Sequence, residues 1–402
     1  MSDILGDNQT FIYLPLAAGL ISLSIKSLSG GLSYLAHFRR SLSGGNSPKG
    51  NPRVSVLIPV RGVDDGLREN MAAVLDQEYP SFDVTIIADD FSDPALAELS
   101  SEIESGRLRV HISEKAEGQS GKISKLMSAV ASLPEATEVI LFADSDARPS
   151  SHWMSALVRE LDREGIGAST GYRWFLPTGP SLATEIRSSW NASVASVLGA
   201  DPSGNFCWGG STAIKRSLFE SLGIAERWRG ALSDDYVIMR TMRDAGLGIA
   251  FVPAAMTASI ENCGLRGLLE FTTRQMKITR VYAPKFWILS LISSLIHCLV
   301  VSWSIALIAL SSDEFLRTSA VLTLALVWGL GVAKARLRMM AMGLAMPQHR
   351  DRLKRQMKWQ LILWTVTPFV FLYNCLAALV SREVTWRGIR YRMVSPSETE
   401  II

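Results

Sequence analysis

The sequence predicts an α/β fold, with a mostly parallel, Rossmann-like sheet that has helices on both faces, joined to transmembrane or interfacial helices. Three short runs, Val54–Pro59, Val84–Ala88 and Val139–Ala143, are continuously apolar, and a helical pattern follows each. Such runs are typical of parallel strands that are buried on both faces. Hydrophobic residues make up 48% of the 402 residues, and the mean hydropathy is +0.19. This excess lies in four apolar stretches, which predicts the membrane part.

The first apolar stretch covers residues 11–38 and is interrupted only by Lys26 and His37. It is too long for a signal-peptide core, so we predict a signal anchor. Phe286–Ser311 has no Asp, Glu, Lys or Arg and is long enough to cross a bilayer. Thr318–Ala333 is short for a span, and Trp359–Ser381 is adequate. The predicted organisation is an anchor at 1–40, a linker at 41–52, a globular domain at 53–285, membrane or interfacial helices at 286–381 and a basic tail at 382–402.

Charged residues beside the apolar stretches predict the orientation. Two acids, Asp3 and Asp7, precede the first stretch, whereas basic residues such as Arg39 and Arg40 follow it. The positive-inside rule then places the globular domain in the cytoplasm, as part of an integral membrane protein. A single crossing by 359–381 would put the basic tail outside, so Pro368 can instead mark a re-entrant or interfacial segment. The charge pattern leaves both possibilities open.

Composition excludes some functional classes. The net charge is only +3 and no basic stripe carries interleaved aromatic residues, so nucleic-acid binding is not expected. The four cysteines have neither disulfide nor zinc spacing, which fits a reducing cytoplasmic face. They are Cys207, Cys263, Cys298 and Cys375.

Two carboxylates follow the third predicted strand. Asp144 and Asp146 are separated by one residue, so both side chains can converge on one hard cation. Mg²⁺ or Mn²⁺ held there would neutralise charge on a departing diphosphate. The alternative, that the two residues only cap the next helix, is the better one for an isolated Asp-x-Asp. The strand context and the other motifs favour the metal site.

Other polar segments occur at strand ends and turns. Asp90 follows the second strand and can accept hydrogen bonds from a nucleoside, or can belong to an Asx turn before Pro94. Gly118–Lys122 can supply backbone and a cation to a diphosphate, although it is not a Walker loop. Trp208–Thr212 contains two glycines, which suit either close approach of a ligand or a tight turn.

One acidic pair begins a helical pattern. In the run Leu232–Tyr236, either Ser233 or Asp234 can serve simply as the N-cap. A carboxylate at such a position can also act as a general base toward an acceptor hydroxyl. Farther on, Arg274–Arg280 carries three cations just before the second apolar stretch, where positive-inside residues are common.

Taken in order, these segments resemble the membrane-bound family 2-like glycosyltransferases, and most closely the ceramide glucosyltransferase group. The resemblance runs from about Val54 to Arg392. The family's first aspartate motif is similar to the segment around Asp90, and the Gly121-Lys122 step has a counterpart. Its second motif is matched by Asp144, and its acidic-Asp-Tyr motif by Asp234-Asp235-Tyr236.

The family's next motif, Gln/Arg-x-x-Arg-Trp, is only partly matched. Arg274 aligns with its first residue, but Lys277 replaces the arginine and Ile278 replaces the tryptophan. Lysine lacks the bidentate fork of arginine and isoleucine cannot stack, although Arg280 can compensate. The tail Trp386–Arg392 is similar to the Trp-Arg-x-x-x-Tyr ending of relatives.

The resemblance implies a GT-A type domain that uses a UDP-sugar and Mg²⁺ or Mn²⁺ and inverts the anomeric carbon. The acceptor would be a membrane lipid hydroxyl such as that of ceramide, and the sugar would be glucose. Asp235 would be the catalytic base, and Asp144 and Asp146 the metal ligands. The expected donor-binding residues are Asp90, Gly121, Lys122, Asp144, Arg274, Lys277 and Arg280. The alternatives are a processive polysaccharide synthase and a non-enzymatic membrane scaffold or transporter component.

Overall fold

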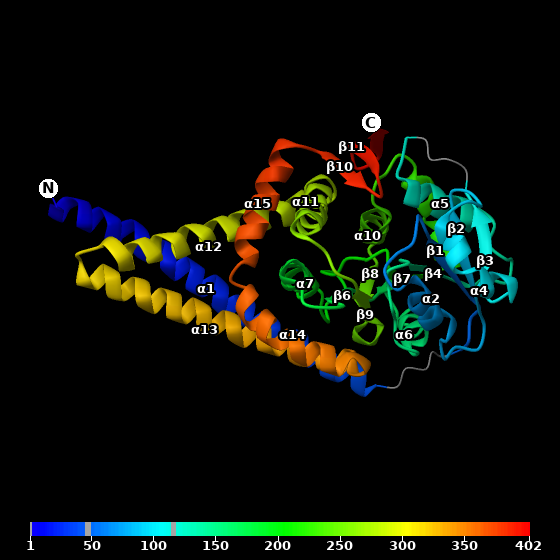
Figure 1. The fold of residues 1–402 in the computed structure, drawn as a ribbon, viewed down its shortest axis with the longest axis horizontal. Helices are drawn as coiled ribbons and strands as arrows, with labels where there is room; N and C mark the ends of the chain where they lie inside the picture. Colours follow the sequence, from blue (N-terminus) through cyan, green and yellow to red (C-terminus); the bar gives the residue numbers. More distant parts are fainter. Residues whose placement is uncertain (1, 45–49, 114–117) are drawn as a thin grey trace.

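The computed structural model describes residues 2–44, 50–113 and 118–402, with side chains from residue 9 onward. A globular α/β part lies at one end, and three long helices extend from it (Figure 1). Residues 45–49 of the predicted linker lie outside the described residues.

A seven-stranded sheet forms the centre of the globular part. Six strands point in one direction, and β7 alone is antiparallel to both of its neighbours. The strands in their order across the sheet are β3 (Arg109–Ile112), β2 (Phe82–Ala88), β1 (Val54–Pro59), β4 (Val139–Ala143), β7 (Ser211–Lys215), β5 (Ile166–Thr170) and β8 (Gly248–Phe251). The mostly parallel sheet is therefore confirmed, and the three predicted strands are β1, β2 and β4.

Helices cover both faces of this sheet because successive residues of its strands point to opposite sides. In β1, Val54, Val56 and Ile58 pack in one core, whereas Leu57 packs in the other. The first core includes residues of α2 (Leu67–Leu75), α3 (Pro94–Glu98) and α6 (Trp153–Glu160), and α4 (Ser100–Glu104) follows α3. The second includes residues of α5 (Gly121–Ala131), α8 (Arg216–Ser221), α9 (Ile224–Trp228), α10 (Asp234–Asp244) and α11 (Leu265–Tyr282). The predicted arrangement with helices on both faces is confirmed.

A smaller unit joins the globular part to the long helices. Its parallel strands β6 (Arg173–Leu176) and β9 (Thr257–Ile260) form a two-stranded sheet, and α7 (Leu182–Ala195) packs against β6. Its core includes Trp174 and residues from the inner ends of the long helices, such as Phe38 and Met342.

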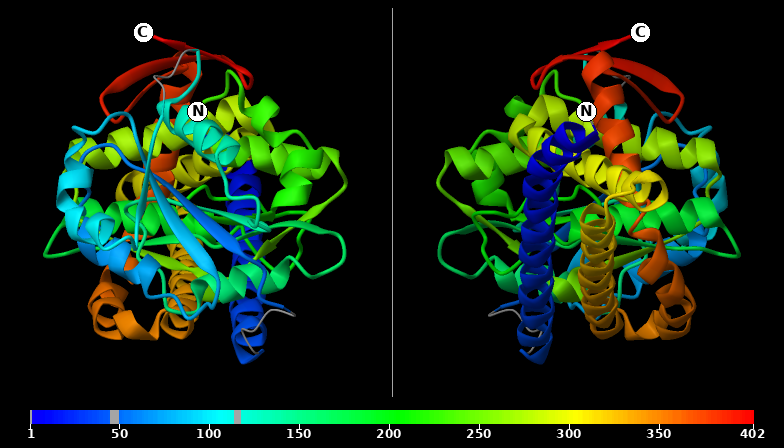
Figure 2. Two further views of the ribbon diagram at one scale, coloured as in Figure 1. Left: turned by 90° about the vertical axis from the view of Figure 1, so that its right-hand side faces the viewer. Right: turned by 90° about the vertical axis from the view of Figure 1, so that its left-hand side faces the viewer.

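Among the residues that the structure describes, three helices are long and apolar enough to cross a membrane: residues 9–43 of α1 (Ser2–Ser43), α12 (Pro284–Leu310) and α13 (Glu314–Ala345). α1 and α13 lie side by side, as the right-hand view of Figure 2 shows. The expectation that 318–333 is short for a span was wrong, because α13 continues as one helix of 32 residues. Its basic residues beyond the uncharged run are helical as well.

The fourth apolar stretch is divided between α14 (Arg350–Leu363) and α15 (Thr367–Val380), which are bent by 70°. This pair counts as one broken span or as a re-entrant segment. Pro368 lies in the first turn of α15, where the missing N–H of proline is tolerated.

The predicted basic tail forms a three-stranded antiparallel sheet of β10 (Glu383–Trp386), β11 (Ile389–Ser395) and β12 (Glu398–Ile401). Val384, Tyr391 and Met393 are buried in the same core as α5 and α10. The tail therefore packs on the globular part and lies above it in the left-hand view of Figure 2.

Candidate active site

A cavity of about 360 Å³ lies at the edge of the sheet where β1 and β4 end and β7 begins. In parallel α/β sheets ligands bind outside the carboxyl ends of the strands. The polar lining residues come from these ends, from the first turns of α5 and α10, from β6, α7, α11 and the end of β9, and from the tail. They include Arg61, Asp64, Lys122, Asp144, Asp146, Arg173, Arg187, Asp234, Asp235, Glu261, Arg274, Arg387 and Tyr391.

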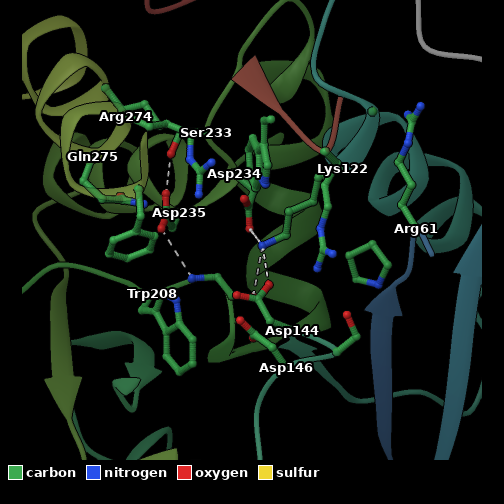
Figure 3. A pocket seen from close by; sticks show the side chains of 18 of the residues that line it. Arg61, Lys122, Asp144, Asp146, Trp208, Ser233, Asp234, Asp235, Arg274 and Gln275 are labelled. Carbon is green, nitrogen blue, oxygen red and sulfur yellow. Dashed lines mark hydrogen bonds and ion pairs between the residues drawn. The ribbon is translucent and has the colours of Figure 1, made fainter. Parts of the chain in front are cut away.

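Lys122 lies between two carboxylates near the centre of the cavity (Figure 3). Its Nζ is 2.8 Å from Asp144 Oδ1 and 3.3 Å from Asp234 Oδ2. Burial lowers the pKa of Lys122, but the two carboxylates outweigh burial and raise the pKa above its usual value. Lys122 is positioned by the first turn of α5, where the Ser120 hydroxyl caps the helix by accepting from the amide of Ile123. The site therefore holds a fixed positive charge.

Arg173, at the start of β6, bridges the two predicted metal ligands. Its guanidinium donates to Asp144 Oδ2 at 2.9 Å and to Asp146 Oδ2 at 3.0 Å. It also lies over the ring of Trp208, at 4.6 Å from the ring centroid. Burial tends to raise the pKa of Asp144, but Lys122 and Arg173 lower it overall. Burial and the charge of Asp144 raise the pKa of Asp146, with Arg173 opposing them.

The two aspartates fit a hard divalent cation. Both present carboxylate oxygens to the cavity (Figure 3), and the buried Oδ1 of Asp146 has no hydrogen-bond partner. Within the described residues there is no group of three or more His, Cys, Asp and Glu side chains that could hold a metal. A cation here would therefore take further oxygen ligands from water or a bound phosphate group, as Mg²⁺ commonly does.

The second acidic pair begins α10. Asp235 Oδ1 accepts from the amide of Tyr236 at 2.8 Å and from the Ser233 hydroxyl, and its Oδ2 accepts from the amide of Gly209 at 3.5 Å. Asp234 is only 2% exposed, and burial raises its pKa to about 6 even though Lys122 opposes this shift. Both acids line the cavity, but Asp234 pairs with Lys122 whereas Asp235 accepts from neutral donors.

The glycine pair of the Trp208–Thr212 segment lets these groups approach the backbone. A β-carbon on Gly209 would lie 2.2 Å from Asp234 Oδ2 and 2.8 Å from Lys122 Nζ. One on Gly210 would lie 2.7 Å from Asp144 Oδ2 and closer still to the ring of Trp208. The glycines are thus required by the side chains that surround the cavity.

The three cations of α11 have different surroundings. Arg274 lines the cavity and lies over the ring of Trp386, at 5.6 Å from its centroid. Burial, together with Arg173 and Arg387, lowers the pKa of Arg274 to about 10. Lys277 and Arg280 do not line the cavity. Lys277 donates to the carbonyl of Glu383 at 2.7 Å, and Arg280 donates to the carbonyls of Ala378 and Leu379. They hold α11 to the end of α15 and the start of the tail sheet.

Asp90 also lies outside the cavity lining. It follows β2, is exposed, and accepts from the amide of Ser92 at 2.7 Å, as in an Asx turn. Its neighbour Asp89 is 3.0 Å from Lys125 Nζ, and Lys125 does line the cavity. Of the predicted site residues, the structure thus brings together Gly121, Lys122, Asp144, Asp146, Asp235 and Arg274.

Several lining residues lie outside the predicted set. Arg173 and Arg187 come from β6 and α7, in segments where no sequence pattern marks a site. Tyr391 belongs to the tail motif noted in the sequence, and its hydroxyl accepts from the amide of Gly121 at 3.2 Å. Arg387, in the turn between β10 and β11, pairs with Asp64 at 2.6 Å and has a positive φ of 50°.

The sequence matches a known protein family and a curated protein. Residues 19–398 match the profile of the family described as glycosyl transferase family 21. A probable glycosyltransferase of Bacillus subtilis (strain 168), YdaM, is 26% identical over 268 residues, which cover 63% of this chain and 61% of that protein. The chain thus spans less than two thirds of the length of this curated relative.

Solved structures resemble the chain at low sequence identity. The mannosyltransferase PcManGT from Pyrobaculum calidifontis, in complex with GDP-Man and Mn²⁺, is 19% identical with a TM-score of 0.47, covering 91% of this chain and 98% of its own. Glucosyl-3-phosphoglycerate synthase from Mycobacterium tuberculosis, in complex with Mn²⁺ and UDP-glucose, is 17% identical with a TM-score of 0.38, covering 61% and 82%. The order and directions of the strands agree with the predicted GT-A type of α/β fold.

Proposed function

Because the chain belongs to glycosyl transferase family 21, we propose that it transfers a sugar from a UDP-sugar to a hydroxyl group of a membrane lipid, with inversion at the anomeric carbon. The family supports glycosyl transfer as the reaction. We further propose the donor, the acceptor, the metal and the inversion.

One observation carries the proposal. A pair of carboxylates, a buried lysine and a carboxylate at a helix start line the same cavity. The residues are Asp144 and Asp146, Lys122 and Asp235. A displacement at a sugar carbon needs charge stabilisation on the leaving diphosphate and a base for the attacking hydroxyl, and these groups supply both.

Asp144 and Asp146 are the proposed ligands of Mg²⁺ or Mn²⁺, which when bound would act as a Lewis acid toward the donor diphosphate. Lys122 is positioned to bind the same diphosphate when it exchanges a carboxylate partner for a phosphate oxygen. Arg274 adds a second cation from the opposite side of the cavity (Figure 3). These side chains are already gathered around one cavity, so binding would require an exchange of partners and no large movement.

Asp235 is the proposed catalytic base. It would accept the proton of the lipid hydroxyl while that oxygen forms a bond to C1 of the sugar and the bond from C1 to the diphosphate breaks. Its carboxylate is held by Ser233, Tyr236 and the amide of Gly209. A base that is held in this way keeps the orientation that the attack requires.

The location of the cavity supports a lipid acceptor. α11 contributes Phe271 and Gln275 to its wall and is followed directly by the apolar helix α12. A lipid that left the bilayer would lose about 0.8 kcal/mol per methylene exposed to water. A site beside the membrane avoids this cost. The positive charges around Arg39 and Arg40 support a cytoplasmic location for the globular part.

The test uses the full chain in membranes with Mn²⁺ and radiolabelled UDP-sugars, including UDP-glucose, and with ceramide, diacylglycerol or a sterol as acceptor. We expect label in an organic-extractable glycolipid, and mass spectrometry identifies the sugar and the lipid. Label in a polymer that stays in the aqueous or insoluble fraction would instead identify a processive synthase. Absence of any transfer or donor hydrolysis, with protein shown to be folded, would contradict the proposal.

A further inference from the structure

A second cavity lies among the long helices, away from the sheet edge. Its volume is about 460 Å³, and α1, α7, α12, α13 and α15 contribute its walls. α7 separates it from the candidate active site, because Arg187 of this helix lines the first cavity whereas Ser193 and Val197 line the second. The wall residues are largely leucines, serines and small residues.

Two cations of α13 line this cavity, and none of the described residues that line it is acidic. Lys334 donates to the hydroxyl of Ser27 at 2.6 Å. Arg338 is only 3% exposed, and it donates a hydrogen bond to the hydroxyl of Ser193 at 3.5 Å. Both partners are neutral. A buried cation without a counter-charge is strongly disfavoured, so an anion bound in this cavity would be stabilised by both cations.

Unsatisfied donors also point to a ligand. The buried Nε of Arg338 has no hydrogen-bond partner, and neither has the indole Nε1 of Trp364, another lining residue. Arginine with an open N–H edge is suited to phosphate, which accepts two parallel hydrogen bonds from the guanidinium. Lys334 lies one turn from Arg338 on the same helix, so both cations can reach one group.

The depth of the two cations in the membrane fits a lipid headgroup. Lys334 comes 20 residues after Glu314, the first residue of α13, which corresponds to about 30 Å along the helix. This length matches the hydrocarbon thickness of a bilayer. When Glu314 lies at one surface, Lys334 and Arg338 lie at the other. The end of α13 that leads to α14 is the one toward the globular part (Figure 1). Apolar residues such as Leu20, Leu23 and Leu289 line the same cavity, where acyl chains would lie.

We propose that this cavity binds the phosphate group of an anionic membrane lipid, with Lys334 and Arg338 on the phosphate oxygens and the acyl chains against the apolar walls. The site is separate from the sugar-transfer site and does not depend on the function proposed for that site. Such a lipid would neutralise the two cations and fill the space between the long helices and α7.

The test is a lipid titration of the purified full chain followed by native mass spectrometry. The probes are phosphatidylglycerol, phosphatidylcholine and diacylglycerol with the same acyl chains, and inorganic phosphate. We expect phosphatidylglycerol to bind at least about tenfold more tightly than the other three, because only it joins a net negative phosphate to acyl chains. Lys334→Met and Arg338→Gln should each weaken this binding about tenfold or more, since each removes a charged hydrogen bond.

The matched control is Lys26→Met, because Lys26 lies on α1 beside Ser27 but is exposed and does not line the cavity. It should bind phosphatidylglycerol like the unmodified chain. Equal binding of all three lipids, or equal losses with Lys26→Met, would overturn the proposal. Binding of inorganic phosphate as tight as that of phosphatidylglycerol would show that the ligand is a free anion and not a lipid, and would also overturn the proposal. Should Arg338→Gln fail to fold, Lys334→Met alone decides the outcome.

Discussion

Arg173 donates to Asp146 at 3.0 Å, so the chain's own guanidinium lies against the carboxylate predicted to hold a divalent cation. The same group donates to Asp144, the other predicted ligand, at 2.9 Å. A bound metal ion would compete with Arg173 for these oxygens. The arginine neutralises the aspartates in this structure, and it would become available to a phosphate group if a cation took its place.

Replacing Arg173 by methionine should destabilise the protein mainly in the absence of a divalent cation. Removing one partner of a buried ion pair costs about 3–5 kcal/mol because the other charge is left uncompensated. Mn²⁺ would restore the missing positive charge, so the loss should become much smaller in its presence. Thermal unfolding of the purified variant with EDTA and with Mn²⁺ measures this difference.

Arg187→Met is the control for Arg173, because Arg187 lines the same cavity but pairs with Glu261 at 3.0 Å. Its unfolding temperature should respond to Mn²⁺ like that of the unmodified chain. An equal loss for Arg173→Met with EDTA and with Mn²⁺ would show that the arginine and the metal do not share a site.

Asp144→Asn and Asp146→Asn should each lower the affinity for Mn²⁺ by at least about tenfold, because an amide is a weaker ligand for a hard cation. Electron paramagnetic resonance of free Mn²⁺ measures binding without the need for transfer activity. Glu270→Gln is the control, since Glu270 lines the cavity but pairs with Arg266. Unchanged Mn²⁺ affinity in both aspartate variants would remove them from the metal site.

Asp235→Asn should lower the rate of transfer about 10²–10⁴-fold, the usual contribution of a general base, while UDP binding changes little. The measurement combines transfer kinetics with calorimetric titration of UDP. Asp244→Asn, at the exposed end of the same helix where it pairs with Arg227, should leave both quantities unchanged. An active Asp235→Asn variant would exclude this residue as the base.

Asp234 predicts a pH dependence of stability. Burial raises its pKa from 3.8 to about 6, so between these values the folded chain binds the proton while the unfolded chain releases it. The contribution of Asp234 to stability should therefore fall as the pH rises from about 4 to 6. The pKa difference of about two units corresponds to about 3 kcal/mol. Asp234→Asn lacks this titration, so its stability relative to the unmodified chain should rise across this range and then stay level.

Unfolding curves of both proteins in EDTA, at several pH values from 4 to 8, test the sign. EDTA excludes stabilisation by a bound metal from the comparison. A difference between the two proteins that does not change between pH 4 and 6 would show that Asp234 titrates normally in the folded chain.

The tail residue Tyr391 contacts the candidate site, so a change at this position should affect transfer. Tyr391→Phe removes the acceptor for the amide of Gly121, next to Lys122, and should lower kcat/KM for the donor about 2–10-fold. Tyr373→Phe is the control, because Tyr373 is 52% exposed on α15. Transfer assays at several donor concentrations compare the two variants. A larger effect of Tyr373→Phe would contradict a role of the tail in the site.

The sequence predicted the parts of the fold that depend on local patterns. The apolar runs of β1, β2 and β4 lie in the centre of the sheet, where burial on both faces requires continuous apolar residues. β5, β8 and the tail strands were not predicted, because they are short and combine glycine, serine or charged residues with apolar ones. Their pairing is decided by distant segments.

The site was predicted where carboxylates follow a strand or begin a helix, as with Asp144, Asp146 and Asp235. Arg173 was not predicted, because its role depends on β6 lying beside the end of β4, which no local pattern encodes. Lys277 and Arg280 were predicted to bind the donor, yet they contact backbone carbonyls of the tail region. The sequence could not indicate these contacts, because the acceptor closest to each cation is set by the tertiary structure. Their roles in donor binding stay predictions.

The contact between Gly121 and Tyr391 has a consequence for biosynthesis. The two residues are 270 positions apart, and the later one belongs to a sheet that follows the long apolar helices in the sequence. Because a chain is synthesised from its N-terminus, a nascent chain lacks this acceptor for the Gly121 amide until residue 391 has left the ribosome. The candidate site edge beside Lys122 therefore stays open to solvent during most of translation.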